Sequence, residues 1–222
     1  MKISVVIPLY NEKDHICQVV NGLVRYKMPV VIVNDGSKDN SLQKIQRLKI
    51  PKLKILSHKI NLGKGAAMLT GAEYAFKNRS DTVVFMDADG QHNPKDMKEF
   101  IKQIQLNKYD VILGSRNLSQ NMPLIRYLGN KLASYTLNLF FGIKFTDPLS
   151  GYRAITKKVF EKIKWDSSGY SVESEILANI AKRNLKFIEI PIDTIYHDKD
   201  KGVTVLDAFG VLLDVLKWRL SP

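Results

Sequence analysis

Short apolar runs that alternate with helical segments are the feature of this sequence that most constrains its fold. The first five runs lie at 2–8, 30–33, 54–57, 82–86 and 110–114. Continuous apolar runs of this length are typical of strands that are buried in a parallel sheet. A helical pattern separates each run from the next, so strand and helix alternate four times. This order predicts a single α/β domain with a doubly wound, mostly parallel sheet and helices on both faces.

Polar residues or glycine follow each of these five predicted strands. They are Tyr10-Asn11-Glu12, Asp35-Gly36-Ser37, Gly63-Lys64-Gly65, Asp87 with Asp89, and Gly114-Ser115-Arg116. Turns are polar in any protein, so one such segment carries little information. Five of them indicate more, because the carboxyl ends of parallel strands share one edge of the sheet. Open α/β sheets bind their ligands at that edge, so we expect these loops to form one pocket.

Two carboxylates one residue apart follow the fourth predicted strand. Asp87 and Asp89 come directly after the apolar run, and Gln91 adds a third oxygen donor. Oxygen ligands suit a hard cation such as Mg²⁺ or Mn²⁺, which usually completes its coordination shell with substrate phosphates. A second interpretation is that the two aspartates cap the helix that follows.

The charge of the chain favours an anionic partner. Lys and Arg outnumber Asp and Glu by 34 to 22, so the formal net charge is +12. A nucleotide, a nucleic acid or an acidic membrane surface would each fit that charge. The one cysteine excludes an internal disulfide and indicates a reducing compartment. The sequence predicts no signal peptide, and no apolar run reaches the roughly 18 residues of a membrane span, so we expect a cytoplasmic protein.

The segment 111–146 differs from the rest of the chain in its charge, since it contains four basic residues and no Asp or Glu. Within it, 124–141 has the pattern of a helix with leucines on one face, at Leu124, Leu128, Leu132 and Leu139. A basic and partly apolar segment fits an acidic lipid surface or a lipid-phosphate acceptor, so we expect peripheral association with the inner face of the membrane. The last predicted helix, 203–220, is a second candidate for this contact. A core helix with a solvated basic face is the alternative for 124–141.

Seven segments occur in a characteristic order along the chain. They are Val6–Glu12, Asn34–Ser37, Asn61–Gly65, Asp87–His92, Gly114–Arg116, Asp147–Arg153 and Pro191–Tyr196. In this combination the chain resembles the family 2 glycosyltransferases with the GT-A fold, over nearly its whole length. Among them it is most similar to the dolichyl- or polyprenyl-phosphate mannose and glucose synthases. One departure is Gly90, where related synthases often have leucine.

The resemblance implies an inverting, metal-dependent enzyme. It would move a hexose from a nucleoside-diphosphate sugar, GDP-mannose or UDP-glucose, to a polyprenyl or dolichyl phosphate. Residues 1–116 would bind the nucleotide sugar, and residues 117–222 would bind the acceptor. Mg²⁺ or Mn²⁺ would be the cofactor, and a separate membrane protein would be a further partner.

The resemblance also implies roles for individual residues on the donor side. The residues around the nucleotide sugar would be Pro8, Tyr10, Glu12, Asp35, Lys64, Asp87, Asp89 and Arg116. Among them, Asp35 would accept a hydrogen bond from the base, and Lys64 would lie near the phosphates. Asp87 would position the ribose or the sugar, and Asp89 and Gln91 would bind the metal.

On the acceptor side, the resemblance implies that basic residues grip a phosphate group. The candidates are Arg126, Lys131, Arg153, His197 and Lys201. Asp147 would lie near the sugar and the acceptor and, with Asp89 and Arg116, would be catalytic. Arg116 suits an anionic oxygen because its guanidinium is a planar fork. An internal ion pair within the loop is the alternative for Asp147 and Arg153.

Two other functions fit parts of the sequence. A family 2 transferase could act on a saccharide hydroxyl, which needs a general base, and Asp147, Glu173 or Glu175 would then supply it. A lipid phosphate is already ionised at neutral pH and needs no base. The net charge also permits a nucleic-acid-binding module without enzymatic activity, although none of the usual nucleic-acid motifs occurs.

Overall fold

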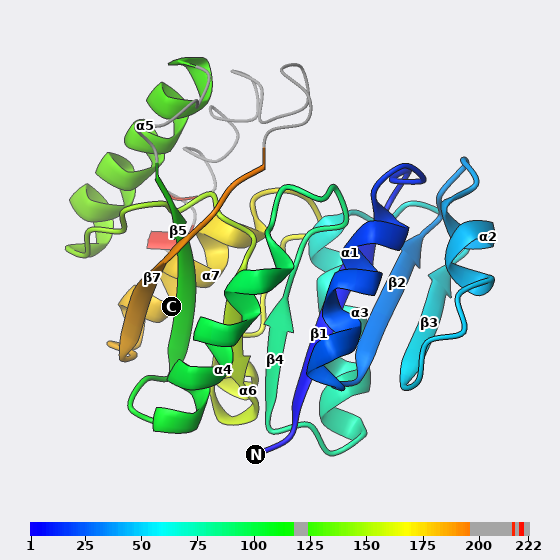
Figure 1. Cartoon of the computed structure of the whole chain (residues 1–222). Helices are drawn as coiled ribbons and strands as arrows, with labels where there is room; N and C mark the ends of the chain where they lie inside the picture. Colours follow the sequence, from blue (N-terminus) through cyan, green and yellow to red (C-terminus); the bar gives the residue numbers. More distant parts are fainter. Residues whose placement is uncertain (118–123, 196–214, 216–217, 220–222) are drawn as a thin grey trace.

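The computed structural model describes residues 1–117, 124–195, 215, 218 and 219. At its centre lies a seven-stranded sheet with the strand order β3-β2-β1-β4-β6-β5-β7 (Figure 1). The strands are β1 (Ile3–Leu9), β2 (Val30–Asp35), β3 (Leu53–His58), β4 (Thr82–Phe85), β5 (Val111–Arg116), β6 (Arg153–Thr156) and β7 (Phe187–Ile192). β6 runs antiparallel to both of its neighbours, and the other neighbouring pairs are parallel. The mostly parallel sheet predicted from the sequence is confirmed.

Alternation of side chains along the strands gives the sheet two apolar faces. In β1, Val5 and Ile7 pack on one face and Val6 packs on the other, and all three are buried. One face is covered by α1 (Ile16–Leu23) with η1 (Val24–Tyr26), α2 (Ser41–Gln46), and α4 (Met97–Leu106) with η2 (Pro94–Asp96). The other face is covered by α3 (Lys64–Lys77), α6 (Lys157–Ile163) and α7 (Val172–Lys182). Helices on both faces are the arrangement expected of a doubly wound fold.

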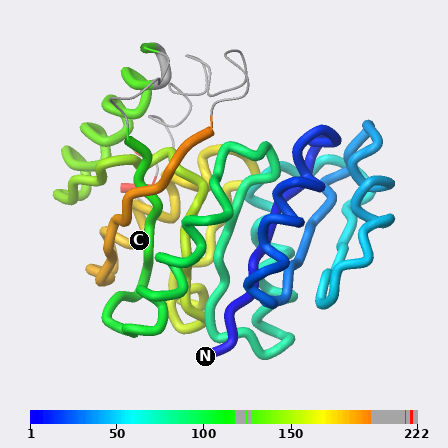
Figure 2. The backbone as a smooth tube through the Cα atoms, viewed as in Figure 1, coloured from blue at the N-terminus to red at the C-terminus, as the bar shows by residue number. Residues whose placement is uncertain are grey.

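β6 connects the two parts of the sheet. Ile155 in this strand pairs with Val83 of β4 on one side and with Val111 of β5 on the other. Figure 2 shows this late segment of the chain, in yellow-green, between strands that come much earlier in the sequence. Among the described strands, the neighbours of β5 are β6 and β7, so the strand that ends in Arg116 is attached to the second half of the chain.

The helix α5 (Leu124–Phe141) turns three polar residues and Leu137 inward, and four leucines outward. Asn130, Ser134 and Thr136 are buried, and the Ser134 hydroxyl donates a hydrogen bond to the backbone oxygen of Phe145. Five large apolar side chains are between 50% and 72% exposed, namely Leu124, Leu128, Leu132, Tyr135 and Leu139. A core helix would bury these leucines, so that alternative is wrong. Among the described residues, no helix has the length and the apolar character that a membrane span needs.

Two glycines at the start of α3 allow a close contact with the loop that follows α6. Gly63 has a φ of +100°, and a Cβ on Gly65 would lie 2.0 Å from the backbone oxygen of Ser167. The indole N–H of Trp165 donates to the Gly65 oxygen at 2.9 Å. The backbone of this loop therefore leaves no room for a side chain at Gly63 or Gly65.

We expect Gly65→Ala to lower the free energy of unfolding by about 1–3 kcal/mol, because the added methyl group overlaps this backbone. Gly129→Ala in α5 is the matched control, since nothing in the described residues lies within 4 Å of its added Cβ. That change should be neutral or should stabilise by up to about 1 kcal/mol, because alanine favours the helix. Urea unfolding of the two variants measures the difference, and equal stabilities would contradict the contact.

Candidate active site

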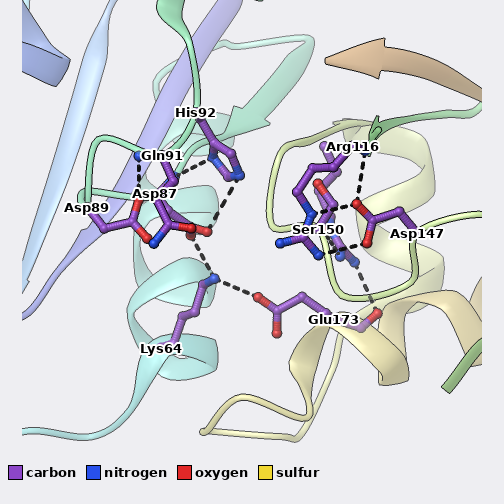
Figure 3. A network of polar contacts seen from close by, with 10 residues as sticks. Lys64, Asp87, Asp89, Gln91, His92, Arg116, Asp147, Ser150 and Glu173 are labelled. Atoms are coloured by element: carbon purple, nitrogen blue, oxygen red, sulfur yellow. Dashed lines mark hydrogen bonds and ion pairs between the residues drawn. The ribbon is translucent and has the colours of Figure 1, made fainter. Parts of the chain in front are cut away.

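Three charged side chains from different elements meet at the end of β4 (Figure 3). Asp87 follows β4, Lys64 begins α3, and Glu173 lies in the first turn of α7. The Lys64 Nζ is 2.7 Å from Asp87 Oδ1 and 2.6 Å from Glu173 Oε1, and all three side chains are largely buried. Lys64 therefore joins the strand end to the second half of the chain and is not a solvated loop lysine.

The charges in this cluster stabilise one another. Burial of the ammonium group would lower the pKa of Lys64, but the negative charges of Asp87 and Glu173 raise it well above its usual value. Burial would raise the pKa of Asp87, but the charge and hydrogen bond of Lys64, together with smaller contributions from neighbouring groups such as Arg153, outweigh burial and lower it to about 2. Lys64 and Asp87 are therefore both charged at neutral pH.

His92 supports the backbone of the loop that carries Asp87. Its Nδ1 accepts a hydrogen bond from the Asp87 N–H at 3.2 Å, which requires a ring without a proton on that nitrogen. Burial lowers the pKa of His92, so the ring is neutral at neutral pH. His92 stacks on Tyr152 with ring centroids 4.9 Å apart, and Tyr152 stacks on Phe100 of α4 at 4.3 Å. The loop is thus fixed to the apolar core beneath it.

Asp89 and Gln91 lie in a tight turn at the same edge of the sheet (Figure 3). The Gln91 N–H donates to Asp89 Oδ1 at 3.0 Å, and both residues are half-buried. Gly90 between them has a φ of +74°, a left-handed conformation that glycine adopts without strain. The turn therefore explains why glycine stands at this position.

The donor set of this turn suits a hard divalent cation. A carboxylate and an amide oxygen are ligands that Mg²⁺ and Mn²⁺ accept. Within the residues that the structure describes, no three His, Cys, Asp or Glu side chains are grouped so that they could hold a metal ion. Mg²⁺ commonly takes one or two carboxylates from a protein and its other ligands from water and phosphate, so Asp89 and Gln91 fit as a partial set.

Arg116 and Asp147 form a bidentate ion pair (Figure 3). Arg116 ends β5, and its Nε and Nη2 donate to Asp147 at 2.6 and 2.8 Å. The Arg116 backbone N–H donates to the same carboxylate at 3.0 Å. Nδ2 of Asn130 in α5 also donates to this carboxylate. The Asp147 side chain is 0% exposed, and its carboxylate faces Arg116. These contacts hold Arg116 in place, and the catalytic role that the resemblance implies for Asp147 stays a prediction.

Arg153, one of the residues expected to bind the acceptor, lies beneath the site in this structure. It is buried, and its guanidinium donates to the backbone oxygens of Glu173 and Ser150 at 3.1 and 2.5 Å. Arg153 therefore ties the loop before β6 to the start of α7, and among the described residues it forms no ion pair within its own loop.

Two further carboxylates hold loops of the site in place. Glu175 of α7 accepts hydrogen bonds from the N–H groups of Asp166 and Ser167 at 2.9 and 2.8 Å. Glu189 of β7 accepts one from the Thr146 N–H at 2.8 Å. Sequence reasoning considered Glu175 only as a general base and did not identify Glu189, because a carboxylate that binds loop backbone has no local sequence pattern.

The residues expected around the base gather at the ends of β1 and β2. Asp35 ends β2 and is buried, and Tyr10 follows β1 and is exposed. Pro8 and Glu12 are partly buried. The adjacent pairing of β1 and β2 brings these residues to the edge of the sheet where Asp87 and Arg116 also lie.

The acceptor candidates are described only in part. Lys131 is exposed on α5, and its Nζ is 5.5 Å from the centroid of the Tyr127 ring. Arg126 belongs to the same helix. His197 and Lys201 lie outside the described residues, as does most of the predicted helix 203–220. Lys131 therefore shares a helix with the exposed leucines.

The sequence profile of one family, Glycosyl transferase family 2, matches residues 4–164. A UDP-N-acetylglucosamine–dolichyl-phosphate N-acetylglucosaminyltransferase of Methanococcus voltae is 32% identical over 242 residues, which cover 99% of this chain and 96% of that protein. A dolichol-phosphate mannosyltransferase of Pyrococcus furiosus is 32% identical over 238 residues, which cover 99% of this chain and 65% of that protein.

A solved structure has the same fold. It is glucosyl-3-phosphoglycerate synthase from Mycobacterium tuberculosis in complex with Mn²⁺, UDP-glucose and phosphoglyceric acid. It matches this structure with a TM-score of 0.76 at 19% identity, over 100% of this chain and 80% of that one. At this identity the likeness concerns the GT-A-type fold alone. Because the family profile covers residues 4–164, most of the chain, this protein belongs to glycosyl transferase family 2 and is a glycosyltransferase.

Proposed function

We propose that this chain is an inverting, metal-dependent transferase that moves a hexose from a nucleoside-diphosphate sugar to a polyprenyl or dolichyl phosphate. GDP-mannose and UDP-glucose are the donors that the sequence favours. The relatives from Methanococcus voltae and Pyrococcus furiosus are both named for dolichyl- or dolichol-phosphate. The observation that carries the proposal is that the carboxylates near the site are buried and already bound to other groups of the protein.

Each carboxylate considered as a general base is buried and bound. Asp147 pairs with Arg116, Glu173 pairs with Lys64, and Glu175 accepts two backbone N–H groups. Transfer to a saccharide hydroxyl needs a base that reaches the hydroxyl proton, and none of these three is placed to do so. A phosphate monoester carries its second charge at neutral pH, since the pKa of that ionisation is about 6. It can attack without a base, which favours the lipid-phosphate acceptor over a saccharide.

On the donor side, negative charge grows on the nucleoside diphosphate as the glycosidic bond breaks. Asp89 and Gln91 would hold Mg²⁺ or Mn²⁺, which would stabilise that charge as a Lewis acid. Arg116, which Asp147 holds in place, adds positive charge at the same edge of the sheet. The acceptor phosphate attacks the anomeric carbon opposite the leaving group, so the configuration inverts.

Transfer assays test the proposal directly. Purified protein is incubated with GDP-mannose or UDP-glucose and Mn²⁺, and with either a polyprenyl phosphate or free saccharides. We expect a glycosylated lipid phosphate of inverted anomeric configuration, identified by NMR, and no product after EDTA removes the metal. Transfer to saccharides alone would overturn the acceptor assignment, and a retained configuration would overturn the mechanism.

The outer face of α5 supports contact with an acidic membrane surface. Its five exposed apolar side chains form the leucine stripe, defined here as Leu124, Leu128, Leu132, Tyr135 and Leu139. The surrounding segment 111–146 has four basic residues and no acidic one. Apolar side chains flanked by basic groups are the arrangement that binds the interface of anionic lipids. Such a contact would hold the site close to an acceptor whose phosphate lies at that interface.

We expect the protein to sediment with vesicles that contain anionic lipid more than with neutral vesicles at low salt. Leu132→Glu should weaken this binding about tenfold, because it places a negative charge in the leucine stripe. Leu106→Glu is the control, since Leu106 at the end of α4 is 49% exposed and Leu132 is 50% exposed. Equal effects of the two substitutions, or equal binding to both kinds of vesicle, would contradict the role of α5.

A further inference from the structure

The segment that follows β7 reaches across the edge of the sheet to the loop after β4. β7 lies at the end of the sheet, and β5 and β6 separate it from β4. His92, in the loop after β4, nevertheless forms an antiparallel bridge with Thr194, and the Ile195 N–H donates to the backbone oxygen of Gln91 at 3.0 Å. Figure 1 shows the orange chain beyond β7 leaning across β5. We call residues Asp193–Ile195 the strap.

The strap is also anchored at its start. The Asp193 N–H donates to Asp96 Oδ2 at 2.9 Å. Asp96 is the last residue of η2, and the Tyr26 hydroxyl donates to a backbone oxygen of η2 at 3.0 Å. Because Tyr26 holds η2 from the side of η1, Asp96 is a fixed point for the strap.

These contacts hold the backbone of Gln91 from two directions. Its N–H donates to Asp89 Oδ1 at 3.0 Å within the turn, and its oxygen accepts from Ile195 of the strap. The amide side chain of Gln91 starts from this backbone, so the strap sets where its oxygen can lie. Groups that hold a metal ligand without touching the metal commonly change metal affinity by about 10–100-fold.

We propose that the strap, anchored at Asp96, positions Gln91 for a divalent cation. Asp96 and the Ile195 N–H act as positioning groups, and neither touches the metal. Because the strap continues from β7, the metal turn after β4 depends on a segment from the far end of the sheet. The inference rests on the proposed function, because it requires Asp89 and Gln91 to hold the cation.

Ile195→Pro removes the N–H donor of the strap. A proline requires an extended residue before it, and Thr194 meets this condition in its β-bridge. Ile195→Ala is the matched control, because it removes the exposed side chain and keeps the N–H. Mn²⁺ is titrated into the full chain with UDP or GDP present, and free Mn²⁺ is measured by electron paramagnetic resonance. We expect the Mn²⁺ dissociation constant to rise about 10–100-fold in Ile195→Pro and to stay unchanged in Ile195→Ala.

Asp96 offers a second pair of variants at the other end of the strap. Burial and the nearby charge of Asp193 raise the pKa of Asp96, so the strap needs a hydrogen-bond acceptor from this side chain more than it needs a charge. Asp96→Asn keeps an acceptor for the Asp193 N–H and should bind Mn²⁺ as the wild type does. Asp96→Ala has no acceptor and should bind Mn²⁺ about tenfold more weakly.

The outcomes separate this inference from the proposed function. If the wild type binds Mn²⁺ and both Ile195→Pro and Asp96→Ala bind it equally well, the role of the strap is overturned and the transferase proposal stands. Equal losses in Asp96→Ala and Asp96→Asn would also overturn that role, since the hydrogen bond would not be the cause. A wild type that binds no Mn²⁺ with either nucleotide would overturn the proposed metal site, and the inference with it.

Discussion

Lys64→Met is expected to lower the free energy of unfolding by about 3–5 kcal/mol. The Lys64 side chain is 18% exposed, and its Nζ lies 2.7 Å from Asp87 and 2.6 Å from Glu173. Its removal leaves two largely buried carboxylates without the counter-ion that they share. Methionine has a similar length and keeps the apolar stem, so the loss reports on charge more than on packing. Urea unfolding followed by circular dichroism measures it.

Lys164 provides a matched control on the surface. Its Nζ is also 2.7 Å from a carboxylate, that of Glu73, but the two side chains are 52% and 51% exposed. Lys164→Met should cost about 0–1 kcal/mol, because water and salt screen an exposed pair. Similar losses in the two variants would mean that burial does not determine the strength of the Lys64 contacts.

The ion pair between Lys64 and Asp87 also predicts how the free energy of unfolding depends on pH. The pKa of Asp87 is about 2 in the folded chain, below the value of about 3.9 for an unfolded aspartate. The contribution of Asp87 is therefore complete above about pH 4 and is lost as the pH falls to about 2. The difference in stability between the wild type and Lys64→Met should shrink over the same range. A difference that stays constant down to about pH 2 would contradict the ion pair.

Asp89→Ala is expected to reduce transfer by about 10³-fold or more and to leave stability nearly unchanged. Asp89 is half-buried, and the hydrogen bond that its side chain accepts comes from the nearby Gln91 N–H. Its loss therefore disturbs little of the fold. The same carboxylate is the proposed metal ligand, so the variant should also lose Mn²⁺ binding in calorimetric titrations with UDP present. Thermal denaturation checks that the protein remains folded.

Asp14→Ala is the control for Asp89. Asp14 is an exposed carboxylate in the loop before α1, with Lys44 Nζ at 3.9 Å. The control should keep both transfer and Mn²⁺ binding. Undiminished turnover in Asp89→Ala would remove Asp89 from the metal site, and unfolding of that variant would show that the turn at Gly90 needs the carboxylate for its structure.

The strands that the sequence predicts are those with an apolar pattern of their own. β1, β2 and β4 are continuous apolar runs, and each appears close to its predicted place. β6 was not predicted, because its four residues, Arg-Ala-Ile-Thr, begin with an arginine and are too few to form a pattern. Its identity as a strand comes from pairing with β4 and β5 on both sides, which depends on tertiary context.

The candidate site was predictable as a group of strand-end loops but not in its contacts. The family resemblance implies that Lys64 lies near the phosphates, and in the structure its ammonium lies between Asp87 and Glu173. Glu173 comes from α7, far along the chain, and nothing near Lys64 in the sequence indicates that partner. Arg116 was identified at the right edge, but its bond to Asp147 again joins residues from distant segments.

The helix α5 shows a different limit of sequence patterns. Leucine spacing predicted the helix correctly, but spacing does not tell which face is turned to the core. The inward face is decided by hydrogen bonds from Asn130 to Asp147 and from Ser134 to the Phe145 oxygen. These short polar side chains and Leu137 form the inward face, and four other leucines of the helix remain outside.

The position of β6 also sets the order in which the sheet can form while the chain is being synthesised. β1 to β4 pair with one another and are complete at residue 85, whereas β5 ends at residue 116 and its first partner, β6, ends at residue 156. At ribosomal rates of about 5–20 residues per second, those 40 residues take roughly 2–8 s to make. During that time the edge of β4 and the apolar β5 are open to pairing with other nascent chains. Crowded polysomes are therefore the place where this protein is most exposed to misassembly.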